Sequence, residues 1–600
     1  MARRRALLRT AGAIAAAAAL AAGCATVPTV GPPVAVAGSS GPAQQFVQPI
    51  PPQPTKSWSP RDIVLGFLTA SAEFPSVGHR SAALRFLAPE LRKSWRPSWA
   101  VSVVAPGSVQ ATSTMASARV LGKVTQVATI SLTGQRLATI SDKGQYLDQP
   151  GSQSARFRLA RFHGQWLIIG LPSAASSLLT TADFEQVYQP RNLYFWSPST
   201  GQLVPEPVFV PQTDALPNVA SNLVDALLKS SLEQGSWLAT ATSTAFPNGT
   251  TLLGVSIKGS DAVVNLGGTA TSADPLQLQR MAAQLVTTLT STSYSQSPIS
   301  RSVTLEIEGQ PHDFDGIPEQ QPTDYEHLIP RFAAGSQTLY FIGASGAVSE
   351  LSRGSHASVV PGPAGHAQIP FAKIAVSPAQ PPELAATLAT GRGCVVYYGA
   401  LAGTAALDHR DLPNPGDGSC VSLSWDSLRN IWAATAHRIW VLPPGGRQPE
   451  AVYPPALPGS KPQSYKILAL RVALDGVRVA MLVQTQSGQR ELLVAAATRS
   501  DGQISLGPAI TIGTSLKDPA AISWYDPDHL IVLSGSQLYE VPVNGGATET
   551  VGPGGAGSQV ITSAGPGQIA VGGHGEILTS SGPNQIQQPA EKGTSPAYPG

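Results

Sequence analysis

The residues whose chemistry is easiest to assign stand at the amino terminus. A basic cluster comes first and consists of Arg3, Arg4, Arg5 and Arg9. An apolar run over residues 11–22 follows and ends in Gly23-Cys24. This run is too short to span a bilayer, and its position behind a basic segment is typical of a cleaved export signal. A thiol directly after small residues is where a bacterial lipobox carries diacylglycerol, so we expect residues 1–23 to be a signal peptide and Cys24 to be lipidated.

Lipidation at Cys24 would anchor the chain to the extracytoplasmic face of the membrane. Each buried CH₂ of an acyl chain contributes about 0.8 kcal/mol, and two or more chains hold a protein stably. Residues 24–57 are rich in proline and predict an extended linker between the lipid and the folded part. The alternative is an ordinary secretory peptide with Cys24 incidental. The pair Arg4-Arg5 leaves Sec and twin-arginine export both open.

Two further cysteines, Cys394 and Cys420, complete the set. Each stands in or beside a strand-like run, and neighbouring antiparallel strands bring such positions within bonding distance. An even pair in an oxidising compartment favours one disulfide. The alternative is two unpaired, buried thiols.

Motifs for catalysis are missing from the sequence. It contains no G-x-S-x-G elbow, no phosphate-binding P-loop and no H-E-x-x-H pair. Residues 552–557 match G-x-G-x-x-G by letters, but no helix is expected after them, and residues 312–316 read as a solvated loop. We therefore predict no catalytic residue, no metal site, no cofactor and no enzyme activity. With 13% charged residues and a net charge of +2, no nucleic-acid partner is expected.

The pattern of elements predicts three folded domains after the linker. Residues 58–185 begin with a helix at Ser59-Pro60 and continue with alternating runs, which indicates an α+β domain of the NTF2-like type. Residues 190–315 give the order strand, helix, strands, helix, strand, which indicates a compact α/β domain.

Residues 330–582 lose helical periodicity and show short strands with Gly, Pro and Asp turns. Strand pairs around an Asp turn recur at Asp426, Asp475 and Asp526, with separations of 49 and 51 residues. An all-β period of this length is typical of a β-propeller blade, and the length allows five to seven blades. Residues 583–600 are polar and rich in Pro and Gly, and we expect a disordered tail.

Several segments of the sequence resemble a known family. Residues 218–228, 246–250, 262–266 and 284–289 look like a GerMN domain, named for spore-germination proteins; Asn265 stands where that domain usually has Asp. Together with the lipobox, residues 60–68 and the propeller, the whole mature chain resembles the actinobacterial LpqB lipoprotein family. The resemblance implies a membrane-anchored protein that binds the extracellular domain of the sensor histidine kinase of an Mtr-type two-component system and modulates it, with effects on cell envelope and division.

A second hypothesis belongs to another class. Aromatic residues on the propeller, Trp425, Trp440 and Trp524, could stack on sugars and make this a cell-wall glycan-binding or glycan-processing lipoprotein. Burial of the same residues between blades is the plainer expectation.

Overall fold

The computed structural model describes most of the chain from residue 53 onward. The described stretches are 53–72, 80–95, 101–120, 123–141, 144–172, 177–211, 216–230, 236–330, 338–352, 356–366, 369–388, 393–413, 418–455, 465–500, 503–555, 557–582 and 585–600. Cys24 and the predicted signal peptide lie outside these residues. Residues from Pro49 to Gly600 form one compact unit.

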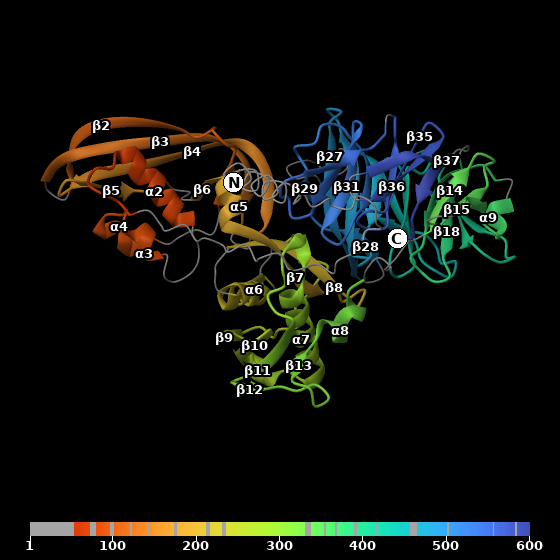
Figure 1. Ribbon diagram of the computed structural model, residues 1–600, viewed down its shortest axis with the longest axis horizontal. Helices are drawn as coiled ribbons and strands as arrows, with labels where there is room; N and C mark the ends of the chain where they lie inside the picture. Colours follow the sequence, from red (N-terminus) through yellow and green to blue (C-terminus); the bar gives the residue numbers. More distant parts are fainter. Residues whose placement is uncertain are drawn as a thin grey trace, which may run out of the picture. The chain divides into compact units, whose positions relative to one another are not determined.

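Three helices and a six-stranded sheet form the N-terminal domain. The elements are α2 (Pro60–Ala72), α3 (Arg80–Leu84), α4 (Pro89–Ser94), β1 (Val101–Val104), β2 (Gln110–Val120), β3 (Lys123–Ile140), β4 (Tyr146–Phe162), β5 (Gln165–Gly170) and β6 (Ser177–Thr180). The sheet order is β5-β4-β3-β1-β6, and β2 pairs with β3. Figure 1 shows the helices on one side of the long strands.

Local sequence explains how this domain begins. The hydroxyl of Ser59 accepts the N–H of Asp62 at 3.3 Å, and the carboxylate of Asp62 accepts the N–H of Ser59 at 3.1 Å; the two bonds form a capping box at the predicted start of the helix. Ile63 and Phe67 then share one hydrophobic core with Phe157 of β4. Helices packed on a sheet that is antiparallel except for the β1–β6 pair agree with the α+β class, whereas the NTF2-like type stays a prediction.

The second domain contains a hairpin, two long helices and a small sheet. Its elements are α5 (Thr181–Val187), β7 (Tyr188–Trp196), β8 (Leu203–Pro211), α6 (Leu216–Ser230), β9 (Thr250–Lys258), β10 (Asp261–Gly268), η1 (Thr269–Ser272), α7 (Pro275–Thr290), η2 (Ser293–Ser295), β11 (Ser302–Ile307), β12 (Gln310–Pro311), β13 (Glu319–Gln320), α8 (Pro322–Tyr325) and η3 (Glu326–Leu328). Helix α7 connects the parallel pair β10–β11. It begins directly after Asp274, whose carboxylate accepts the N–H of Gln277 at 2.8 Å and so caps the helix.

The rest of the chain is almost entirely β-structure. The elements are β14 (Leu339–Gly343), β15 (Val348–Leu351), β16 (Ser358–Val359), α9 (Pro363–His366), β17 (Phe371–Val376), β18 (Glu383–Leu388), β19 (Val395–Ala400), β20 (Asp408–Asp411), β21 (Ser422–Trp425), β22 (Ile431–Ala434), β23 (Ile439–Leu442), β24 (Glu450–Val452), β25 (Tyr465–Val472), β26 (Arg478–Thr485), β27 (Arg490–Ser500), β28 (Gln503–Leu506), β29 (Ile510–Ile512), β30 (Pro519–Trp524), β31 (His529–Ser534), β32 (Gln537–Pro542), β33 (Glu549–Pro553), β34 (Val560–Ser563), β35 (Ile569–Gly573), β36 (Glu576–Gly582) and β37 (Gln585–Ala597).

Strand β37 closes the propeller and corrects one prediction. It lies between β36 and β14 in a seven-stranded sheet of order β16-β15-β14-β37-β36-β35-β34 (Figure 1). This sheet is therefore two blades joined by one strand, and with the four other sheets it makes a six-bladed propeller. The prediction of a disordered tail is wrong for residues 585–600, because β37 pairs with the preceding strand β36 and also with β14, which is distant in sequence.

Hydroxyl groups connect the blades around the centre. The innermost strands β17, β21, β25, β30 and β34 and the strand β37 contact one another in a ring. An innermost strand has no ladder partner on one edge, so its free N–H groups need other acceptors. The hydroxyl of Ser424 accepts the N–H of Val472 at 3.0 Å, and that of Ser595 accepts the N–H of Ile374 at 3.0 Å.

Candidate functional site

The second domain and the propeller share a hydrophobic core. Val204 of β8, Trp237 and Leu238 lie in one buried cluster with Val477 and Trp524 of the propeller. Burying apolar surface from both domains joins them more firmly than surface contacts would. We call this junction the seam, and it places the hairpin β7–β8 beside the turns of three propeller blades.

Those turns repeat one arrangement built on aspartate. Asp426, Asp475 and Asp526 each follow the first strand of a blade, and each carboxylate accepts the N–H two residues later, at 2.9, 2.8 and 2.7 Å. Each carboxylate also bonds to a basic side chain: Asp426 to Arg499 at 2.9 Å, Asp475 to Arg478 at 2.6 Å, and Asp526 to His529 at 2.9 Å. The predicted Asp-turn repeat thus has a physical role, since the carboxylate fixes the turn between two strands.

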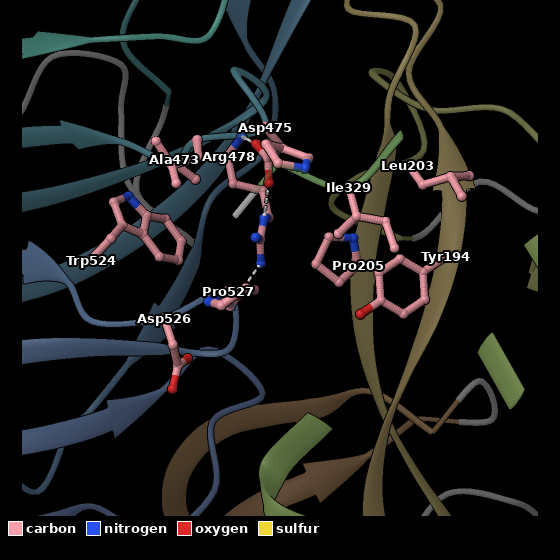
Figure 2. Close-up of a pocket in the computed structure, with 12 residues that line it drawn as sticks. Tyr194, Leu203, Pro205, Ile329, Ala473, Asp475, Arg478, Trp524, Asp526 and Pro527 are labelled. Carbon is pink, nitrogen blue, oxygen red and sulfur yellow. Dashed lines mark hydrogen bonds and ion pairs between the residues drawn. The ribbon is translucent and has the colours of Figure 1, made fainter. Parts of the chain in front are cut away.

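Arg478 stands at the centre of the seam (Figure 2). Besides its bond to Asp475, it donates to the carbonyl of Pro527 at 2.6 Å, and its guanidinium lies 5.0 Å from the ring centroid of Trp524. Figure 2 shows Tyr194 and Ile329 across a small pocket from these groups. The guanidinium therefore ties two adjacent Asp turns to each other next to the second domain.

Asp528 bonds directly to the second domain. Its carboxylate accepts the side-chain amide of Asn192 at 2.5 Å and the backbone N–H of Tyr294 at 3.2 Å. Tyr294 has a φ of 52°, which is the left-handed region that non-glycine residues rarely occupy. Burial raises the pKa of Asp528, and the nearby charge of Asp526 raises it further. The seam therefore holds a buried carboxylate against a strained segment.

His529 sits within the same group of carboxylates. Its Nδ1 lies 2.9 Å from Asp526 and 3.4 Å from Glu540, and its ring meets Tyr294 edge-on with centroids 5.2 Å apart. Burial lowers the pKa of His529, but the hydrogen bond and charge of Asp526 and the charges of Glu540 and Asp528 outweigh burial and raise it above 6.5.

Asp526, His529 and Glu540 could each offer one ligand atom to a metal ion, within 4.8 Å of one another. The Nδ1 of His529 is already bonded to Asp526, however, and the neighbouring turn has Asp475 with Arg478 in the same arrangement. A guanidinium cannot be a metal ligand. We therefore interpret the histidine as the basic partner of an Asp turn.

A larger cleft of about 720 Å³ opens beside Asp528. Its wall at the end of α7 carries the hydroxyls of Thr287, Thr290, Ser291, Thr292 and Ser293. Its charged lining residues are Glu326, Asp526 and Asp528, and its remaining wall contains the β34–β35 turn. This volume lies within the usual range of ligand sites, roughly 300–1,000 Å³. The cleft can receive a hydrogen-bonding ligand or a segment of a partner.

The residues predicted from sequence fall at several places. Cys24 lies outside the described residues. The structure pairs Cys394 with Cys420, with 4.8 Å between their Cα atoms. Residues 552–557 include the end of β33 and no following helix in the described part. Residues 312–316 lie in the turn after β12, where Asp313 accepts the N–H of Gly316 at 3.1 Å.

The tryptophans proposed for sugar stacking are buried. Trp425, Trp440 and Trp524 are 3%, 6% and 5% exposed. The plainer expectation of blade packing is therefore correct for all three. A buried ring offers no face to a sugar, so the glycan hypothesis loses the surface on which it depended.

Sequence reasoning missed the residues of the seam. Asn192, Tyr294 and Asp528 belong to no local motif, and the first and last are 336 residues apart. The sequence pointed to this region only through Asp526, a turn residue of the repeat that lies two positions before Asp528.

The fold and the seam define a multidomain, mostly β protein in which a GerMN-like domain packs on a six-bladed propeller. Three family models match the chain in this order: the N-terminal domain of lipoprotein LpqB over residues 53–185, the sporulation and spore germination domain over 192–313, and the LpqB beta-propeller domain over 346–599. The chain belongs to the lipoprotein LpqB family.

Relatives support this over nearly the full length. Lipoprotein LpqB of Thermobifida fusca is 29% identical, with 97% of each chain covered. That of Streptomyces coelicolor is 27% identical, covering 97% of this chain and 96% of the relative. The tandem GerMN domains of GerM from Bacillus subtilis match at 18% identity and a TM-score of 0.18, over 27% of this chain and 59% of that one.

Within the described residues, no helix is long and apolar enough to cross a membrane.

Proposed function

We propose that this chain is an extracytoplasmic lipoprotein, anchored by Cys24, that binds the outer domain of a sensor histidine kinase of the Mtr type and modulates its signalling. It acts by binding rather than by catalysis. The seam is the surface we assign to the partner, because it brings a rigid propeller face, the GerMN-like domain and a cleft of about 720 Å³ together. Family membership supports the lipid anchor.

The chemistry of the cleft supports a protein partner. Its walls present hydroxyls and carboxylates, which suit the backbone amides and basic side chains of a peptide segment. The one aromatic residue among those that line the cleft is Tyr194, which is 7% exposed, so the cleft has little aromatic surface for sugars. Asp528 lines the cleft and also holds the seam, so the partner would sense how the two domains are joined.

The anchor is tested by fractionation of cells. Cys24→Ala should move the full chain from the membrane fraction to the soluble fraction or the medium, and the native amino terminus should carry a diacylglycerol mass. An unmodified terminus, or retention of Cys24→Ala in the membrane, would contradict lipidation.

Partner binding is tested with the full chain in detergent and the purified outer domain of the kinase. We expect co-migration, and we expect substitution of the cleft residue Thr290 by Arg to weaken it at least about tenfold, since a long cation would fill the cleft. Arg410→Ala, on the outer strand β20, serves as control. The hypothesis would be contradicted if the chain and the kinase domain did not co-migrate and if kinase phosphorylation were unchanged in cells that lack the lipoprotein.

A further inference from the structure

The charge of the chain is unevenly divided between its domains. The N-terminal domain, residues 53–185, has 14 lysines and arginines and seven aspartates and glutamates, which gives a net charge of +7. Residues 186–600 have 21 basic and 30 acidic residues, which gives a net charge of −9. A basic domain therefore follows directly after the predicted linker, and an acidic remainder follows that domain. Such a division indicates that the basic domain meets an anionic partner.

Part of the basic charge lies on one face of the N-terminal sheet. On β4, Phe157 is buried in the core that the sheet shares with the helices. Side chains alternate along a strand, so the neighbouring Arg156 and Arg158 point to the opposite face, and both are exposed. Figure 1 shows the helices of this domain on one side of the long strands. The two arginines therefore lie on the side that these helices leave open.

Hydroxyl groups accompany the two arginines. Cross-strand partners share a face, and the pairing of β2, β3 and β4 places four hydroxyl residues beside the arginines: Ser131 and Thr129 directly opposite them on β3, and Thr112 and Thr114 one strand further on β2. We call the surface formed by these six residues the open face. Guanidinium and hydroxyl groups both donate hydrogen bonds to anionic oxygens.

No acidic residue neutralises the open face within the described part of its three strands. The one acid in β2, β3 and β4 is Asp148, eight residues before Arg156 and thus about 26 Å away along the strand. Its carboxylate accepts the hydroxyl of Thr514 in the propeller at 2.5 Å. Neither arginine makes an ion pair with a described residue. The helical side of the domain differs, because it also carries the exposed acids Asp62 and Glu90.

The linker ends on this same domain. The carbonyl of Pro54 accepts Nε2 of Gln165 at 3.0 Å, which attaches the first described residues to β5. A lipid anchor at the start of the linker would keep the domain near the membrane, so a weak affinity for headgroups would suffice to hold it there. An anionic lipid surface attracts basic side chains within a Debye length, and each such side chain strengthens binding about fivefold.

We propose that the open face binds the anionic headgroups of the membrane in which the chain is anchored. The guanidinium groups of Arg156 and Arg158 bond to headgroup phosphates, and the hydroxyls of Thr112 and Thr114 add hydrogen bonds. The same surface potential repels the acidic remainder, so the GerMN-like domain and the propeller are directed away from the lipid. The inference rests on the proposed function only in placing the chain at a membrane.

The test uses the mature chain that begins after Cys24, which has no lipid and keeps the whole compact unit of residues 49–600. We expect it to co-sediment with vesicles that contain phosphatidylglycerol, not with vesicles of phosphatidylcholine alone, and to be released as salt is raised. Equal binding to both kinds of vesicle, or binding to neither, would overturn the proposal. Since this chain has no lipid, the result is independent of whether Cys24 is modified in cells.

Variants locate the surface. The double variant Arg156→Gln, Arg158→Gln should weaken binding to the anionic vesicles at least about tenfold and leave the Tm unchanged, because both side chains are exposed. The double variant Arg447→Gln, Lys466→Gln removes two exposed cations of the propeller and should bind like the wild type. Equal affinity of the wild type and the Arg156/Arg158 variant would overturn the proposed location. Retention on dextran sulfate without vesicle binding would identify an acidic polymer as the partner and overturn the membrane.

Discussion

The side-chain amide of Asn192 donates to the carboxylate of Asp528 over 2.5 Å, and this bond joins two domains across 336 residues of sequence. The same carboxylate accepts the N–H of Tyr294, so one buried group serves two donors from the second domain. Because Asn192 is buried and the bond to Tyr294 is partly buried, solvent replaces a lost acceptor poorly.

Asp528→Ala should destabilise the seam. Losing a buried acceptor leaves two donors unpaired, and we expect the free energy of unfolding to fall by about 2–4 kcal/mol. A double-mutant cycle with Asn192→Ala, measured by chemical denaturation, should give a coupling energy of about 1 kcal/mol or more. Asp408→Ala, at an exposed position of β20, is the control and should change stability little. A coupling energy of zero would show that the two side chains act independently.

The seam should also respond to pH through His529. Its pKa is raised in the folded protein, so its contribution to stability is complete below 6.5 and is lost as the pH rises through the folded-state pKa. Asp528 and Glu540 also have raised pKa values, chiefly through burial, and they act in the same direction at lower pH. Unfolding curves should therefore show stability falling from pH 6.5 upward in the wild type, and less so in His529→Gln. If the exposed control His437→Gln flattens the profile equally, the effect does not come from the seam.

The pairing of Cys394 with Cys420 predicts sensitivity to reductant. The bond links residues separated by 26 positions, for which the entropy of the unfolded chain gives about 3.5 kcal/mol of stabilisation. Reductant should lower the denaturation midpoint of the wild type, and the double Cys→Ala variant should already be lowered and no longer respond. Peptide mapping of the protein isolated from its native cells without reductant should recover the two cysteines linked. Free thiols at both positions would contradict the pairing.

Closure of the propeller depends on close packing at Gly593. A methyl group added there would come within 2.6 Å of the carbonyl oxygen of Ile342 and 2.7 Å of the ring of Phe341. Gly593→Ala should therefore weaken the β14–β37 pair by about 1–3 kcal/mol and expose the carboxyl-terminal strand to limited proteolysis. Gly254→Ala, in a strand with open space around the added methyl, provides the comparison. Equal proteolysis rates in the wild type and Gly593→Ala would mean that the strand does not need this contact.

Features with a local physical cause were predictable. The capping box at Ser59 and Asp62 and the start of α7 at Asp274 depend on side chains three residues from their partners, and the structure has both. The Asp turns recur in sequence because each blade needs the same turn, so their period indicated a propeller.

The sequence by itself determined the domain classes, the repeated turns and the residues that could form a disulfide, because these follow from side-chain periodicity and from contacts close along the chain. Only the tertiary structure decided that residues 585–597 form a strand and that Asn192 meets Asp528. Each of these joins residues far apart in sequence, and such pairings depend on ring closure and domain packing, which no local pattern records.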